Sequence, residues 1–559
     1  MTASFPPGMI LVAGGLLIPF VRGRVREALV LGLPLITLWV VWLVPDGPVV
    51  TLSFLDYQLT PVFGSPVGRL FGTVFSIMAF AGGLFALRQA RTLELAAAFA
   101  YAGSAIAVTS SGDLITVFVF WELMAIGSTL VVLASDQPKA FEASMRYMLV
   151  HLLGGVILMI GIVAHIADTG SVAFEAMRPD SFGRVLILIG FLINAGAPPL
   201  SAWISDAYPE ASPSGTVFLS AFTTKTAVFT LWVAFPGTWI LIPVGLYMVF
   251  YGIIYALLEN DMRRILAYSI VNQVGFMVTG IGIGTEMALN GAASHAFAHI
   301  IYKALLLMSA GSVLYRTGKR KCTDLGGLFR TMPVTTICGG IGALAISAFP
   351  FTSGFVSKSM VAQGAVDQHL AIVWFLLTAA SAGVFLHAGI KFPWFVFFQR
   401  DSGLRPSDPP MNMQWPMLFF AFLSVGIGIY PRPLYAILPY AVEFVPYTIP
   451  HVVAQSQLLL FAGLAFFVLL PQMQRTPTIS LDFDWFYRRF GTALGREFTV
   501  RTTRVWARVV DAAAVRAQSI TYGLLKHHGP HGVLARTWPT GSMVLWVAVL
   551  LGAYLVFYF

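Results

Sequence analysis

The stretch FLINAGAPPLSAWISDAYPEASPSGTVFLSAFTTKTAVF, residues 191–229, is the part of this sequence that decides the fold. It begins as an apolar helix, breaks at Pro198 and Pro199, and crosses a polar turn that holds Asp206. A second apolar helix follows and carries Lys225 near its middle. At membrane depth, an interrupted helix is tolerated only where its freed backbone groups face protein or a water-filled cavity. A lysine in the next span is costly without a function or a partner, so the stretch predicts an ion pathway.

The composition of the whole chain agrees with a membrane protein. Its 559 residues are 57% hydrophobic and only 11% charged, whereas soluble domains contain about 25% charged residues. The apolar runs are close to the length of about 20 residues that a transmembrane helix needs. We therefore expect an all-α polytopic membrane protein with about 14–16 transmembrane helices.

The apolar runs predict sixteen spans, and the short basic loops between them predict their orientation. Most of these loops fall on one side, which the positive-inside rule makes cytoplasmic. The expected spans are 8–21, 27–45, 66–88, 93–109, 114–134, 145–167, 184–203, 213–233, 237–258, 264–283, 291–313, 331–349, 369–399, 413–430, 455–471 and 541–558.

The order of these spans suggests five segments. We expect N-terminal transmembrane helices at 1–60, a proton-translocating core at 61–410, peripheral helices at 411–474, a basic amphipathic lateral segment at 475–540 and a final transmembrane helix at 541–559.

The lateral segment has a surplus of positive charge, with ten Arg and Lys against four Asp and Glu between Arg475 and Arg536. A helix along anionic lipid or partner subunits explains this surplus better than nucleic-acid binding does. A cytoplasmic tail of modest helicity is the alternative.

Two charged residues lie near the middle of expected spans. Glu122, in FVFWELMAIGS, must take a proton or find a cation there. Lys225 lies eleven residues from both Ser214 and Pro236, too deep for its ammonium to escape to the interface. Both residues are therefore predicted to belong to a proton pathway, although Glu122 could instead be a structural side chain bonded to a neighbouring helix.

The expected span 291–313 contains three titratable residues on one face. His295, His299 and Lys303 follow one another at spacings of four residues, which places them above one another on a helix. Two histidines at this spacing could bind a metal, but a zinc site needs a third ligand, and the rest of this face is a lysine. A proton relay is the favoured interpretation.

His387 and Lys391 repeat the four-residue spacing, and Pro393 follows them. Because proline removes a backbone donor and opens a helix, this region predicts a second broken span. Two such spans indicate an internal repeat of the kind found in secondary transporters.

Four further residues are secondary candidates. His151 could serve packing or proton transfer, and Arg263 is expected in an interfacial charge cluster. Lys358 follows a Pro/Gly break and is expected near a channel mouth, and Asp206 is expected to be a solvated or capping residue of its turn.

No feature of the sequence predicts a cofactor. The two cysteines, Cys322 and Cys338, do not form a metal-binding pattern, and the lack of Cys/His clusters argues against haem or iron–sulfur ligation. We assign no catalytic residue, no metal ligand and no cofactor.

Taken together, the motifs resemble the antiporter-like subunits shared by respiratory complex I, membrane-bound hydrogenases and multisubunit (Mrp-type) cation/proton antiporters. The C-terminal LDFDWFYRR, residues 481–489, is most similar to the D-type subunits of the antiporter branch. The matching motifs are FWELM (120–124), PPLSAWISDAYPEASP (198–213), LSAFTTKTAVF (219–229), NDMRRILAYSIVNQVGF (260–276), HAFAHIIYKALL (295–306), MPVTT (332–336) and FPFTSGFVSK (349–358).

The resemblance implies a module with two inverted five-helix repeats, each containing a broken helix. It also implies that Glu122 pairs with a lysine, and that Lys225, His299, Lys303 and Lys391 match a line of titratable residues across the membrane. The family's usual lysine partner is replaced here by Asn194, which carries no charge. Glu122 is therefore expected to pair with Lys225, or else the first half is only a water-lined passage.

The resulting hypothesis is a subunit of a multisubunit Na⁺ or K⁺/proton antiporter in a prokaryotic cytoplasmic membrane, a transporter rather than an enzyme. Its expected partners are a second antiporter-like subunit, small membrane subunits, the lipid bilayer, protons and monovalent cations, with no nucleic acid. The alternatives are a proton-pumping subunit of a quinone-reducing or hydrogenase complex, a structural subunit that conducts nothing, and a subunit of a bicarbonate-uptake complex.

Overall fold

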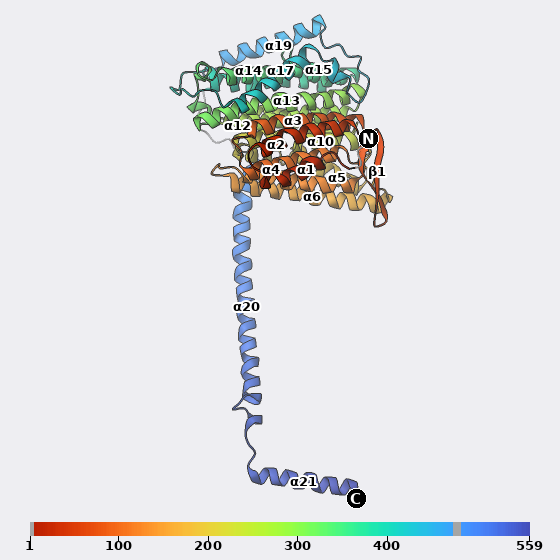
Figure 1. Ribbon diagram of the computed structural model, residues 1–559, viewed down its shortest axis with the longest axis vertical. Coiled ribbons are helices and arrows are strands. Elements are labelled where there is room, and N and C mark those ends of the chain that lie inside the picture. The colour runs from red at the N-terminus through yellow and green to blue at the C-terminus, as the bar shows by residue number, and fades with distance from the viewer. Residues whose placement is uncertain (1–4, 473–481) are drawn as a thin grey trace. The chain divides into compact units, whose positions relative to one another are not determined.

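The computed structural model describes residues 5–472 and 482–559 (Figure 1). It divides the chain into two compact units, Met1–Asp484 and Trp485–Phe559. Each unit is described by itself.

The first unit consists of helices packed side by side with their axes roughly parallel (Figure 1). Its N-terminal part contains α1 (Met9–Leu17), η1 (Ile18–Phe20), α2 (Gly23–Trp42), α3 (Pro66–Ala86), α4 (Thr92–Thr109), α5 (Leu114–Leu133) and α6 (Ala140–Thr169). The middle part contains α7 (Phe182–Ala195), α8 (Trp203–Ala207), η2 (Tyr208–Glu210), α9 (Pro213–Leu219), α10 (Thr223–Ala234), α11 (Leu241–Leu258), α12 (Met262–Ile283) and α13 (Glu286–Thr317).

The last part of this unit begins with two short turns and ends with an exposed helix. It contains η3 (Cys322–Asp324), η4 (Leu328–Arg330), α14 (Pro333–Ile346), α15 (Ser353–Asp367), α16 (Ala371–Val384), the π-helical η5 (Phe385–Lys391) and η6 (Trp394–Phe398), α17 (Met411–Ile429), α18 (Arg432–Tyr435) and α19 (Ile449–Val468).

The helices α12 and α13 form the centre of the unit. The most apolar window of each is completely buried, whereas only 17% of the corresponding window of α19 is buried. A helix that is apolar all round belongs in an interior. The polar residues of α12 and α13 are therefore surrounded by protein.

The prediction of an all-α polytopic membrane protein is confirmed. Among the described residues, thirteen helices are long and apolar enough to cross a membrane, and three shorter apolar helices are present. Two of the shorter ones, α7 and α14, are short because each ends at an interruption of the chain path. The Gly196 residue that ends α7 has φ +83°, a conformation that favours glycine.

A β-hairpin between α2 and α3 was not predicted. Strands β1 (Gly47–Phe54) and β2 (Tyr57–Gly64) pair antiparallel, with Phe54 opposite Tyr57. The N–H of Thr60 donates to Oδ2 of Asp113, the N-cap residue of α5, at 2.8 Å. The hairpin is thereby held at one end of the helices (Figure 1).

The second broken span was predicted at Pro393, but the structure has its break elsewhere. The span Ala371–Phe398 is continuous, and Pro393 lies between two π-helical stretches, whose wider turns accommodate the missing backbone donor. The interruption lies at residues 347–352, between α14 and α15. The expected break at Pro393 is therefore wrong.

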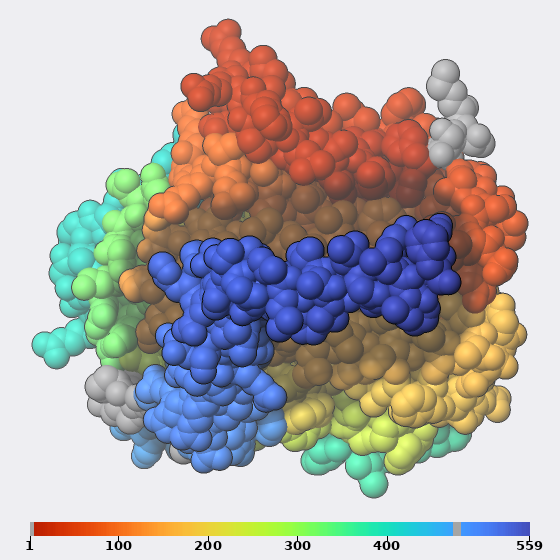
Figure 2. Space-filling view, turned by 90° about the horizontal axis from the view of Figure 1, so that it is seen from below, coloured from red at the N-terminus to blue at the C-terminus, as the bar shows by residue number. Residues whose placement is uncertain are grey.

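The second unit contains η7 (Phe486–Gly491), α20 (Thr492–His528), η8 (Val533–Ala535) and α21 (Thr540–Tyr558). Helix α20 lies within the lateral segment that was expected at 475–540. Neither α20 nor α21 has a buried residue; α21 is the dark blue helix in Figure 2. The expected start of the lateral segment at residue 475 lies outside the described residues.

Candidate functional site

The break between α9 and α10, at residues 220–222, is the first of two helix breaks and exposes a backbone carbonyl to a buried lysine. Helix α9 ends at Leu219 and α10 begins at Thr223. Lys225 is completely buried, and its Nζ donates to the carbonyl oxygen of Ser220 at 2.6 Å and to Oγ1 of Thr224 at 3.1 Å. The lysine thus satisfies a carbonyl at the break between the two helices.

The second interruption has the same arrangement. Lys358, on α15, donates from Nζ to the carbonyl oxygen of Ile346 at 3.0 Å, where α14 ends. Its Nζ also lies 4.8 Å from the ring centroid of Phe276. Lys358, and not Lys391, is therefore the second lysine at a helix break.

Between the two breaks, α13 presents three completely buried titratable residues, His295, His299 and Lys303. His295 lies 3.1 Å from Ser357 Oγ through Nδ1 and 3.1 Å from Gln273 Oε1 through Nε2. Lys303 Nζ donates to Ser269 Oγ at 2.6 Å.

His299 is the central member of this line. His299 interacts electrostatically with His295 and Lys303 on the same face of α13. It also interacts with the lysines at the two helix breaks, Lys225 and Lys358. Neither of its ring nitrogens has a hydrogen-bond partner among the described residues. The imidazole is thus placed to exchange protons with groups from both halves of the module.

His387 and Lys391 lie on η5, and their partners differ. His387 Nδ1 lies 2.8 Å from the carbonyl oxygen of Gly383. Lys391 Nζ donates to the carbonyl oxygens of Ala256, Leu257 and Glu259 at 2.6, 2.8 and 2.6 Å. These carbonyls form the C-terminus of α11, so Lys391 acts as a cap of that helix.

Glu122 is half-buried on α5, and its Oε1 has no hydrogen-bond partner among the described residues. This oxygen lies against Gly155 of α6, where an added Cβ would overlap it. The expected ion pair with Lys225 is wrong, because no contact within 4.0 Å joins the two side chains in the described part of the chain and the lysine binds Ser220 and Thr224.

Asn194 stands where the resemblance leads us to expect a lysine. Its Oδ1 lies 2.9 Å from Nδ1 of His151. Both residues are buried. The imidazole of His151 also packs against the ring of Tyr147 in a tilted arrangement, with ring centroids 4.1 Å apart. Asn194 thus belongs to a polar interior in the first half rather than to its lipid-facing surface.

A hydroxyl chain that the sequence did not predict connects this interior to α10. The Tyr147 hydroxyl donates to Ser128 Oγ at 2.9 Å and lies 3.4 Å from Thr223 Oγ1. The Tyr101 hydroxyl lies 2.7 Å from the same Thr223 oxygen. Thr223 precedes Lys225 by two residues. Aromatic residues at helical spacing look like ordinary core, so only the three-dimensional contacts identify this chain.

Asp206 is buried and paired, contrary to the expectation of a solvated turn residue. Its Oδ2 and Oδ1 accept hydrogen bonds from Arg146 Nε at 2.7 Å and Nη2 at 2.9 Å. This bidentate pair joins α6 to α8.

Arg263 is likewise completely buried. It donates to the carbonyl oxygens of Pro209, Ala211 and Ser212 at 2.7, 2.8 and 2.8 Å. Arg263, the second residue of α12, holds the backbone before α9.

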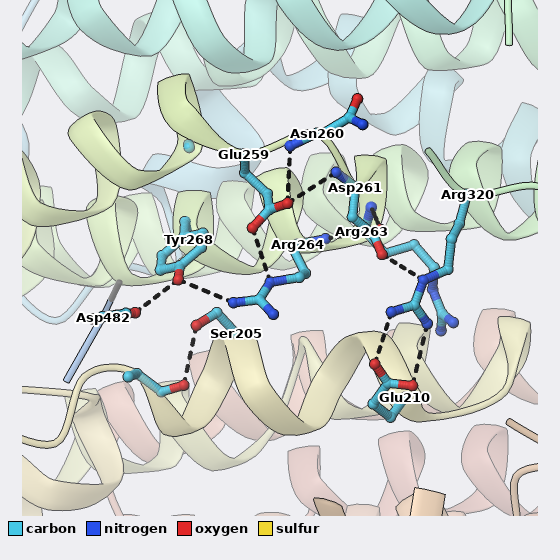
Figure 3. A network of polar contacts seen from close by, with 12 residues as sticks. Ser205, Glu210, Glu259, Asn260, Asp261, Arg263, Arg264, Tyr268, Arg320 and Asp482 are labelled. Atoms are coloured by element: carbon cyan, nitrogen blue, oxygen red, sulfur yellow. Dashed lines mark hydrogen bonds and ion pairs between the residues drawn. The ribbon is translucent and has the colours of Figure 1, made fainter. Parts of the chain in front are cut away.

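A network of ion pairs surrounds the turn between α8 and α9 (Figure 3). Arg320 pairs with Glu210 at 2.7 Å and with Asp261 at 2.5 Å. Burial would raise the pKa of Glu210, but its hydrogen bonds and ion pair with Arg320 keep the pKa of this carboxyl below its usual value. On the other side of the network, Arg264 donates to Tyr268, whose hydroxyl donates to Asp482 at 2.7 Å.

Within the part of the chain that the structure describes, no group of three or more His, Cys, Asp or Glu side chains could hold a metal ion. The buried histidines of α13 instead have serine, glutamine and lysine neighbours. These neighbours favour proton exchange over metal ligation.

Comparison with known proteins agrees with this description. Residues 111–385 match the family model of the transmembrane region of NADH:quinone oxidoreductase and Mrp antiporters. This match contains both helix breaks and all three titratable residues of α13.

Two curated relatives are components of antiporters. The probable K⁺/H⁺ antiporter A/B subunit of Rhizobium meliloti is 29% identical over 357 residues, which cover 59% of this chain and 36% of the relative. The D-type subunit of the Na⁺/H⁺ antiporter of Alkalihalophilus pseudofirmus is 27% identical over 346 residues, which cover 58% of this chain and 70% of the relative. This chain therefore matches only about a third of the length of the first relative.

The fold also occurs in a solved respiratory complex. A chain of the archaeal membrane-bound sulfane sulfur reductase superimposes with a TM-score of 0.72 at 22% identity, covering 99% of both chains. At 22% identity, this similarity is evidence for a shared fold alone.

Proposed function

From the match of residues 111–385 to the NADH:quinone oxidoreductase/Mrp antiporter transmembrane family, we propose that this chain is the proton-conducting subunit of a multisubunit monovalent cation/proton antiporter. The observation that supports this most directly is the line of buried titratable side chains between the two helix breaks. Lys225 and Lys358 bind carbonyls at the breaks, and α13, which packs against α9 and α15, lies between them.

Protons pass along this line by transfer between neighbouring groups. An ammonium such as that of Lys225 releases a proton when its surroundings change, and the imidazole of His299 accepts it on one nitrogen and gives it up from the other. Moving one charge across a 100 mV membrane exchanges about 2.3 kcal/mol. A change of about two pKa units along the line is enough to balance this energy.

The first half supplies a polar route to Lys225. The pair of His151 and Asn194 and the hydroxyls of Tyr147 and Thr223 are uncharged hydrogen-bonding groups in a buried interior. In this proposal, Asn194 contributes an amide that orients His151, and it exchanges no proton itself. Glu122 is a proton acceptor at the edge of this interior.

The complex is proposed to lie in a prokaryotic cytoplasmic membrane. Its other members are a second antiporter-like subunit and small membrane subunits, and the cation passes through one of them. The relatives support this view because both are subunits of cation/proton antiporters.

The second candidate is a proton-pumping subunit of a redox complex, because the family description also includes NADH:quinone oxidoreductase. Purification of the assembled complex through this chain distinguishes the two. The antiporter proposal predicts co-purifying membrane subunits without nickel or iron–sulfur clusters. It also predicts that Na⁺ or K⁺ dissipates a pH gradient in vesicles that contain the complex.

The proposal is contradicted if redox subunits co-purify and if neither cation changes the gradient. If this chain is a structural subunit that conducts nothing, neither cation would change the pH gradient and no redox subunit would co-purify. A bicarbonate-uptake complex would be required for growth at low carbon dioxide rather than at high sodium.

A further inference from the structure

A cavity of about 220 Å³ lies where several helices meet the basic loops. Arg91 and Gln89 contribute from the loop before α4, and Ser135 and Asp136 from the loop after α5. Tyr315 contributes from the last turn of α13, next to the basic loop 316–321. The cavity therefore opens at the face of the module that carries the basic loops.

The polar end of this cavity is a buried carboxylate. Glu94 lies in the first turn of α4, is only 2% exposed, and lines the cavity. Its Oε1 accepts hydrogen bonds from Ser212 Oγ at 2.7 Å and Ser214 Oγ at 2.5 Å. Among the described residues, its Oε2 accepts none. A buried carboxylate is costly when it is charged and only partly bonded, so this group has a reason to take up a proton.

The mouth of the cavity is charged and open to solvent. Arg91 and Asp136 form an ion pair there, with 58% and 75% of their side chains exposed. Exposed ion pairs contribute little to stability. Their charges do attract water to the mouth of the cavity, so water has access to the carboxylate of Glu94.

Two turns along α4, Tyr101 continues the same helix face. A separation of seven residues corresponds to about 10 Å along the axis, and helical side chains lean toward the N-terminus, here toward Glu94. The Tyr101 hydroxyl lies 2.7 Å from Thr223 Oγ1, two residues before Lys225. The carboxylate and the lysine at the first break are thus connected by one face of α4 and the start of α10.

We infer that Glu94 is the intake group through which protons enter the first half from the basic-loop face. A hydronium ion in the cavity transfers its proton to Oε2 and leaves as water. The protonated carboxyl passes this proton inward, by water molecules, to Tyr101, Thr223 and Lys225, and the carboxylate is restored. The inference rests on the proposed proton-conducting function.

The first test compares Glu94→Gln with Glu94→Asp in vesicles that contain the assembled complex. Gln keeps an oxygen for both serines but takes up no proton. Proton movement per assembled complex should fall about 100-fold in Glu94→Gln and be largely kept in Glu94→Asp. A wild-type rate in Glu94→Gln would overturn the inference.

Two controls separate this role from anchoring and from failure of the proposed function. Glu94→Gln keeps the anchor to Ser212 and Ser214, so the complex should assemble and melt as the wild type does. If the melting temperature of Glu94→Gln falls together with its rate, the carboxylate serves only to position α9. If Lys225→Ala transports protons normally, the proposed function itself fails. If Lys225→Ala transports no protons while Glu94→Gln transports them at the wild-type rate, only the intake role of Glu94 is rejected.

A second measurement does not depend on transport. In Glu94→Cys, a small membrane-impermeant cationic thiol reagent should modify the new cysteine from the basic-loop side and not from the opposite side. The natural cysteines, Cys322 and Cys338, are completely buried and serve as the unmodified background. Absence of modification from the basic-loop side would overturn the inference.

Discussion

The buried lysines of this chain differ in what their ammonium groups bind. Lys225 and Lys358 bind carbonyls at interruptions of helices, next to other titratable side chains, whereas Lys391 caps an intact helix end. A lysine at a break can lose its proton while water and neighbouring groups take over its hydrogen bonds. Lys391 instead makes three short hydrogen bonds to carbonyls at the end of α11. We therefore propose that Lys225 and Lys358, rather than Lys391, exchange the protons.

Gly155 offers a way to move Glu122 without removing it. In Gly155→Ala, the new Cβ would occupy the place of Glu122 Oε1, the flexible end of a side chain, so the fold should tolerate the change. Proton movement in vesicles should fall, because the carboxylate is displaced from the polar interior. In the matched variant Gly154→Ala, the nearest atom is Ile193 Cγ2 at 3.2 Å, and transport should stay near wild type. Equal transport in both variants would contradict a role for Glu122.

Asn194→Lys tests whether the departure from the family pattern lies on the path. The new ammonium would replace an amide that lies 2.9 Å from His151, so it would compete with this imidazole for a proton. We expect the pH optimum of transport to move, with Asn194→Gln as the uncharged control. An unchanged pH profile in Asn194→Lys would show that this position is remote from the moving protons.

Arg320 is one of two buried or partly buried arginines, with Arg263, that hold the junction between α8 and α9. Arg320→Ala removes ion pairs from Glu210 and Asp261, whose side chains are only 10% and 9% exposed. The free energy of unfolding should fall by about 3 kcal/mol, measured as a lower melting temperature of the purified complex. Because the pKa of Glu210 is depressed, its contribution is present at neutral pH and is lost as pH falls through the folded-state pKa.

Arg405→Ala is the matched control for this prediction. It removes an i, i+4 pair with Asp401, in which both side chains are well exposed, so the melting temperature should barely change. Equal melting temperatures for Arg320→Ala and the wild type would contradict the assigned role of the junction.

The helices themselves could be predicted from sequence, because apolar runs of membrane length have few alternatives. Interruptions are harder to place. Pro393 is an obvious helix breaker, yet π-helical turns absorb it, whereas the Pro/Gly break before Lys358 coincides with the actual break at residues 347–352. The hairpin at residues 47–64 was missed because it is short and partly apolar. The pairing of Asp206 with Arg146 could not be predicted, since the two residues are far apart in sequence and meet only through packing.

At the scale of the whole molecule, the chain combines a buried polar interior with a second unit whose two long helices, α20 and α21, have no buried residue. Helix α20 is 37 residues long with many arginines, and α21 is an apolar helix of 19 residues without a buried side chain. Such helices are stable where lipid or another protein covers them. The second unit is therefore consistent with a subunit that functions inside a larger membrane complex.

If protons pass between the two helix breaks, cation-dependent proton movement in vesicles that contain the assembled complex depends on the lysines at both breaks. We predict that Lys225→Met and Lys358→Met each abolish this movement, while the complex remains intact. Lys391→Met is the matched control, and it should lower thermal stability but keep transport per assembled complex. Wild-type transport in both Lys225→Met and Lys358→Met, with the complex intact, would contradict the account.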